Sequence, residues 1–90
     1  MSKIWEEITK ETWTQESEAR DSLDQVTMPL SRDAVKWCAL GWIMKNYPSE
    51  YQIALDLFKE ANNIPIIAKW NDDPERTFEE VQAKFKEADL

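Results

Sequence analysis

The residues that most enzymes use for acid-base and nucleophilic chemistry are scarce in this chain of 90 residues. It contains no histidine and one cysteine, Cys38. Without histidine, the serine and cysteine nucleophile pairs that need an imidazole base are excluded. A single cysteine also excludes an internal disulfide, and together with the lack of histidine it argues against zinc. We therefore expect a protein that is not an enzyme, with no catalytic residue, no metal and no cofactor.

One short segment, Asn71-Asp72-Asp73-Pro74-Glu75, carries oxygen ligands of the kind that bind hard cations. Calcium takes roughly six to eight oxygens at regular loop positions. This segment lacks that spacing and the glycine of an EF-hand loop. Asx side chains that bond the local backbone, followed by a proline with a fixed φ, are typical of a turn. The segment is thus predicted to be a turn before a helix.

Two tryptophans, Trp13 and Trp70, each adjoin a polar segment. Tryptophan is enriched at binding hot spots, but its large area also suits it to sealing the edge of a small core. Both interpretations stay open. On the first, the candidate partner-binding residues are Trp13, Trp70, Asn71, Asp72, Asp73, Glu16, Glu18 and Asp21.

The net charge of −7 is unevenly distributed along the chain. Residues 1–31 carry three basic and seven acidic side chains, residues 32–62 carry four of each, and residues 63–90 carry four basic and seven acidic. Two acidic ends around a neutral middle argue against direct contact with nucleic acid or an anionic membrane. They favour a protein partner with a basic surface, although acidic surfaces also serve solubility alone.

The most apolar run of the sequence is Asp33–Tyr47, which is apolar around the whole helical wheel. Such a pattern is typical of a buried helix, so we expect this run to be the central helix of the fold. Within it, Cys38 is expected to be a small buried hydrophobe. Gly41, the only glycine, is expected where another element approaches the helix closely.

Capping signals and helical spacing predict three further helices around this one. They are a helix over residues 3–13 capped by Ser2, one that Ser49 caps and that ends at residues 62–63, and one that Thr77 caps with Glu80 in a capping box. Residues 14–30 are predicted to form a semi-regular loop, and residues 64–70 an extended segment, since Pro65 interrupts them. The predicted fold class is mainly α: a single domain over residues 1–90, a compact bundle of about four helices with one central buried helix.

Several short motifs also carry a resemblance that covers nearly the whole chain. They are Trp13-Thr14-Gln15, Trp37-Cys38-Ala39-Leu40-Gly41, Trp70-Asn71-Asp72 and Glu80-Val81. The chain resembles an uncharacterised family of small helical proteins from bacteria and their phages, classed as a domain of unknown function. In the family pattern, glycine follows Trp-Thr-Gln and recurs in the next loop, where this chain has Glu16 and Asp24. The resemblance implies a bacterial or phage origin and no particular activity.

The absence of catalytic chemistry, the acidic balance and the resemblance together favour a non-enzymatic protein-interaction module. We expect a bacterial or phage accessory factor, with inhibition of a host defence complex as a candidate role. Two alternatives remain. One is a homo-oligomeric structural protein, as a homodimer for example. The other is a small-ligand binding or sequestering protein in which tryptophan, Asn71 and Asp72 line a pocket. No apolar run reaches the ~18 residues that span a membrane and no signal peptide is evident, so we expect a cytoplasmic protein of a bacterium or infected host.

Overall fold

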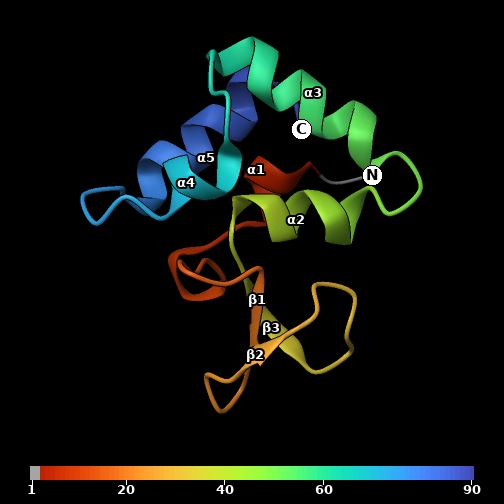
Figure 1. The fold of residues 1–90 in the computed structure, drawn as a ribbon, viewed down its shortest axis with the longest axis vertical. Helices are drawn as coiled ribbons and strands as arrows, with labels where there is room; N and C mark the ends of the chain where they lie inside the picture. Colours follow the sequence, from red (N-terminus) through yellow and green to blue (C-terminus); the bar gives the residue numbers. More distant parts are fainter. Residues whose placement is uncertain (1–2) are drawn as a thin grey trace.

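The computed structural model describes residues 3–90 and shows a group of short helices above a small antiparallel sheet (Figure 1). Helix α2 lies between the two parts and follows directly from the sheet. In chain order the elements are α1 (Ile4–Glu7), the 3-10 helix η1 (Lys10–Thr12), β1 (Ala19–Asp21), β2 (Val26–Thr27), β3 (Ala34–Trp37), α2 (Ala39–Asn46), α3 (Tyr51–Asn62), α4 (Ile67–Asn71) and α5 (Phe78–Glu87).

The expectation of a mainly α bundle is wrong, because the chain forms a mixed fold with a three-stranded antiparallel sheet in the order β2-β1-β3. The sheet occupies the segment that was predicted to be a semi-regular loop together with the start of the predicted central helix. Strand β1 pairs with both neighbours, so that Ala19 lies opposite Thr27 on one side and Trp37 on the other.

A tight hairpin joins β1 to β2. The Asp21 side chain accepts hydrogen bonds from the backbone N–H groups of Leu23 and Gln25, and Asp24 has a left-handed backbone with φ of 62°. A turn followed by one left-handed residue is a common three-residue hairpin connection. The polar residues that made this segment look like a loop are therefore those that close the hairpin.

The predicted central helix over Asp33–Tyr47 is instead two elements, β3 and α2, joined at Cys38. Strand β3 buries Ala34 and Trp37, and helix α2 buries a different set of side chains that includes Trp42 and Ile43. A run that is apolar on all sides has no period that separates a buried helix from a strand followed by a helix. The helix begins where the Cys38 thiol accepts a hydrogen bond from the backbone N–H of Gly41.

Other element boundaries also differ from the expectations. The predicted first helix is broken into α1 and η1, and its expected cap, Ser2, lies outside the described residues. Helix α3 begins after Glu50 without a side-chain cap, so the predicted cap at Ser49 does not form. The segment predicted as extended, residues 64–70, contains most of helix α4.

The capping box predicted for the last helix is confirmed. Thr77 caps α5 by accepting a hydrogen bond from the Glu80 N–H, and the Glu80 side chain accepts one from the Thr77 N–H. Helix α3 ends at Asn62, and its C-cap Asn63 has a left-handed φ of 55°, as expected of an asparagine C-cap.

The core lies where α1, α2, α3 and α5 meet. Phe58 of α3 packs against Phe85 of α5 with ring centroids 4.8 Å apart, and Ile43 and Val81 are fully buried beside them. The two ends of the described chain are adjacent, because the Ile4 N–H donates to the Leu90 carbonyl. Within residues 3–90, the helices are all too short or too polar to cross a membrane.

Candidate functional site

Asn71 is the one buried residue with a polar side chain among residues 3–90, and its carboxamide is fully hydrogen-bonded. Its Oδ1 accepts from the Trp13 indole N–H at 2.7 Å and from the Ala39 backbone N–H at 3.0 Å. Its Nδ2 donates to the Thr14 carbonyl and to Asp72 Oδ1, both at 3.1 Å. A carboxamide has two donors and two acceptor positions, so this one is completely used inside the protein.

The Gln15 side chain and the Glu16 backbone extend this network toward solvent. Gln15 Nε2 donates to the backbone carbonyls of Asn71 and Asp73, both at 2.8 Å. The Glu16 backbone N–H donates to Asp72 Oδ1 at 2.8 Å. We call this set of residues, Trp13–Glu16 with Asn71–Asp73, the Asn71 clasp. It holds together two loops that lie more than fifty residues apart in the sequence.

Trp70 lies on the other side of the same turn and is half-buried. Its ring meets Phe58 edge-on at 6.0 Å, and the Arg76 guanidinium lies 4.2 Å from its centroid. Arg76 also donates to the Trp70 carbonyl and to Glu80. The pKa of Glu80 is lowered, first by the Thr77 backbone N–H and then by Arg76. The Trp70 ring therefore lies between Phe58 of the core and the Arg76 guanidinium.

The structure brings together most of the candidate residues chosen from the sequence. Trp13, Glu16, Asn71, Asp72 and Asp73 belong to the clasp, with Trp70 beside it. Other candidates lie outside it. The Glu18 carbonyl accepts from the Cys38 N–H at 3.2 Å, and Asp21 closes the β1–β2 hairpin.

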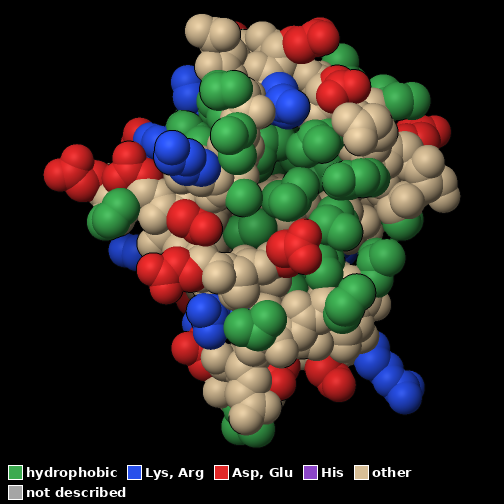
Figure 2. Space-filling model, in the orientation of Figure 1, with side chains coloured by type: hydrophobic (Ala, Val, Ile, Leu, Met, Phe, Trp, Pro, Cys, Tyr) green, Lys and Arg blue, Asp and Glu red, His purple; other side chains and the backbone are tan. Residues whose placement is uncertain are grey.

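Asp72 is the one acidic residue whose carboxylate takes part in the clasp, and further carboxylates lie on its outer side. Residues 14–18 and 71–75 hold five acidic side chains and no basic one. Glu16, Glu18, Asp73 and Glu75 are exposed, and Asp72 is half-buried. We call these five residues the acidic loops. In Figure 2 acidic side chains project from the edge of the molecule where the α4–α5 connection lies in Figure 1.

Two contributors to the site, Gln15 and Arg76, were not chosen as candidates from the sequence. Gln15 belongs to the Trp13-Thr14-Gln15 motif, and its place in that motif was a reason to choose it as a candidate residue. For Arg76 the helical spacing to Glu80 indicated an ion pair, but nothing local indicated its place over the Trp70 ring.

Cys38 is buried, and its thiol stays protonated at neutral pH. Its side chain is 3% exposed, and burial raises the pKa of the thiol from 9.0 to about 11. The thiolate is the reactive form, so at neutral pH this group serves as a helix cap. Among residues 3–90, the His, Cys, Asp and Glu side chains form no group of three that could hold a metal ion.

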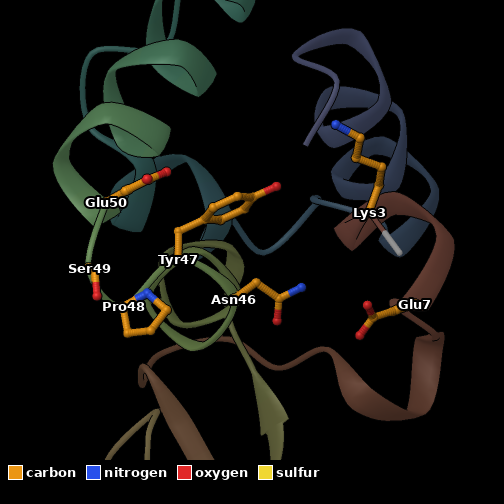
Figure 3. A pocket seen from close by; sticks show the side chains of 7 residues that line it. All are labelled: Lys3, Glu7, Asn46, Tyr47, Pro48, Ser49 and Glu50. Atoms are coloured by element: carbon orange, nitrogen blue, oxygen red, sulfur yellow. The ribbon is translucent and has the colours of Figure 1, made fainter. Parts of the chain in front are cut away.

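A separate cavity of about 680 Å³ opens between α1 and the turn that joins α2 to α3. Figure 3 shows Lys3 and the Tyr47 hydroxyl on either side of the opening, with Glu7 and Asn46 pointing toward each other below them. Lys3 is engaged elsewhere, because its ammonium donates to the Asp89 carbonyl at 3.0 Å. The cavity shares no residue with the clasp, so the expectation of a ligand pocket lined by Asn71 gains no support.

Comparison with known proteins gives one match. The model of a family of unknown function, DUF6197, covers residues 3–89. No curated protein and no solved structure matches the chain. The match confirms the resemblance drawn from the motifs, and because it spans nearly the whole sequence, the chain belongs to this family of unknown function.

Proposed function

We propose that this protein is a non-enzymatic interaction module whose acidic loops bind a partner protein with a basic surface. The observation that carries the proposal is the Asn71 clasp, which fixes two acidic segments from opposite ends of the chain next to each other. A surface that is ordered before binding loses less conformational entropy when the partner arrives. The clasp therefore favours binding by holding the acidic loops in place before the partner arrives.

The charges of the acidic loops support a basic partner. Arg76 is the nearest cation in the sequence, and it is shared between Asp73 at 3.9 Å and Glu80 at 2.9 Å. The other acidic loop carboxylates have no ion-pair partner among the described residues. Clustered charge of one sign steers an oppositely charged protein and raises its association rate, with a strong dependence on salt. The form of this function that we propose is a bacterial or phage accessory factor, with inhibition of a host defence complex as its candidate role.

The test is capture of a partner by the tagged protein from a nuclease-treated bacterial lysate, with washes at low and high salt. One variant neutralises four exposed acidic loop residues while it keeps the clasp: Glu16→Gln, Glu18→Gln, Asp73→Asn and Glu75→Gln. A control variant neutralises four exposed carboxylates on the helices: Asp56→Asn, Glu60→Gln, Glu79→Gln and Glu87→Gln. Both variants change the net charge from −7 to −3.

We expect a captured protein with a basic surface that is released at high salt, is lost from the loop variant and is kept by the control. Equal loss from both variants would mean that overall charge acts without a defined surface. Capture that resists both high salt and the loop variant would contradict a role for these carboxylates.

A further inference from the structure

The sheet and its connections, residues 19–37, carry a concentration of exposed apolar side chains. We call these residues the sheet lobe. The exposed fractions are 76% for Leu23, 70% for Val26, 71% for Met28, 63% for Leu30 and 42% for Val35. A single exposed apolar residue is ordinary, but five of the eight large exposed apolar side chains among residues 3–90 fall within these thirteen residues, which makes the lobe the candidate contact surface.

Strand β2 also offers unpaired backbone groups at the free edge of the sheet. The Asp21 N–H donates to the Gln25 carbonyl, and Ala19 lies opposite Thr27. Hydrogen-bonded and non-hydrogen-bonded pairs alternate in an antiparallel ladder, so the N–H and C=O of Val26 point away from β1. Between Gln25 and Leu30 there is no charged side chain of the kind that protects edge strands from pairing.

The charge of the lobe identifies the class of partner. Residues 19–37 contain three basic and three acidic side chains, so the whole net charge of −7 lies on the rest of the chain. A basic protein would be drawn to the acidic loops and gains no charge attraction from the lobe. A second copy also carries −7 and is repelled by the acidic ends of the chain, whereas two lobes with three charges of each sign meet without net repulsion.

We propose that a second copy of this chain covers the sheet lobe, with the two β2 edges pairing antiparallel about a twofold axis. A twofold contact places the same surface on both sides, so Val26 would lie near its counterpart and the apolar side chains of both lobes would be buried together. The two sheets would then continue as one six-stranded sheet. This inference does not depend on the proposed function, because the acidic loops stay outside the paired edge.

The experiment measures the mass of the full chain by light scattering from about 1 µM to about 1 mM, a range that covers weak and strong association. Val26→Lys places a charge on the edge, and Val26→Pro removes the outward N–H without removing a β1–β2 hydrogen bond. The matched control is Ile53→Lys on α3, where the side chain is 63% exposed. Circular dichroism checks that each variant is folded.

We expect a concentration-dependent dimer for the natural sequence and for Ile53→Lys, with dissociation constants at least about tenfold weaker for both Val26 variants. Added salt should strengthen the dimer, because it screens the two like charges. As a readout that needs no variant, amide exchange at residues 25–28 should slow as the protein concentration rises. A mass that stays monomeric up to about 1 mM would overturn the proposal. A dimer that both Val26 variants leave intact, with unchanged exchange at residues 25–28, would also overturn it.

Discussion

Glu16 and Asp24 have left-handed backbones, with φ of 68° and 62°. These are the two positions at which the family pattern inferred from the sequence has glycine. Residues with a side chain rarely adopt this region, whereas glycine enters it without steric cost. The backbone conformation thus gives a physical reason for glycine at both places and shows that this chain forms the same turns with less suitable residues.

Replacing Asp24 by glycine should raise the free energy of unfolding by about 0.5–1 kcal/mol, because it relieves left-handed strain at the hairpin. Losing the Asp24 carboxylate should cost little stability, because its ion pair with Arg20 is exposed and 3.9 Å long. Urea denaturation would measure the change. Ser22→Gly in the same hairpin is the control and should be neutral or destabilising. Equal effects from the two variants would contradict the role assigned to φ.

Asn71→Asp should lower the free energy of unfolding by about 2–4 kcal/mol at pH 7, because it leaves the Thr14 carbonyl without a donor and sets a charge beside Asp72. The loss should shrink at pH 4, where the new carboxyl can be protonated. Denaturation at both pH values would measure this. Asn46→Asp at the cavity is the control, with an expected change below about 0.5 kcal/mol. A small, pH-independent loss at Asn71 would mean that the clasp is not a buried network.

The Cys38 thiol should react with an aromatic disulfide reagent about a hundredfold or more slowly in the native protein than in urea. The reason is that burial raises its pKa from 9.0 to about 11. Its contribution to stability is complete below pH 9 and is lost as the pH rises toward 11, because the unfolded chain loses this proton first. The natural protein should therefore lose about 2 kcal/mol more than Cys38→Ala between pH 9 and pH 11. Parallel pH curves for the two proteins would contradict this assignment.

At the scale of elements, the sheet is attached to the helices through close backbone contact at Gly41. A Cβ atom built at this position would lie 2.0 Å from the Glu18 carbonyl oxygen. That carbonyl is held by the Cys38 N–H, so neither partner can move without disturbing the junction of β3 and α2. This confirms the expectation that the only glycine marks a close approach.

Gly41→Ala should therefore destabilise the protein by about 2–4 kcal/mol, as overpacking against fixed backbone does. The sign is the reverse of the gain of about 1 kcal/mol that alanine brings at an open helical position. Thermal or urea denaturation would measure it. Gln52→Ala on the exposed side of α3 serves as the control and should change stability by less than about 0.5 kcal/mol. A neutral Gly41→Ala would show that the junction can relax.

The elements that were predicted correctly are those whose signals are local. The cap of α5 needs only Thr77 and Glu80, three residues apart, and both are visible in the sequence. The buried role of Asn71 was missed because its partners Ala39 and Trp13 lie 32 and 58 residues away. The sheet was missed because its strands have two to four residues, too few to show a period.

At the scale of the whole molecule, burial differs between the two parts. The helices share a core in which Ile4, Phe58 and Phe85 are fully buried. Within the sheet lobe only Ala19, Pro29, Ala34 and Trp37 are buried, and Trp37 packs against Trp42 of α2 with ring centroids 5.0 Å apart. The Trp37 indole donates to the Pro29 carbonyl and holds the long connection before β3. The lobe thus has few apolar contacts that must break before it opens.

Amide hydrogen exchange should show this difference directly. In dilute monomer, amides of β2 and of the turns that flank it should exchange by local opening, with protection well below that of α3 and α5. The amides of Cys38 and Trp42 should be protected nearly as well as those of the helices, because they bond to Glu18 and Cys38 inside the junction. A boundary between fast and slow exchange is therefore expected within β3. Uniform protection from β1 to α5 would mean instead that the sheet lobe and the helices unfold only together, and that the junction at Gly41 transmits the stability of the core to the edge strand.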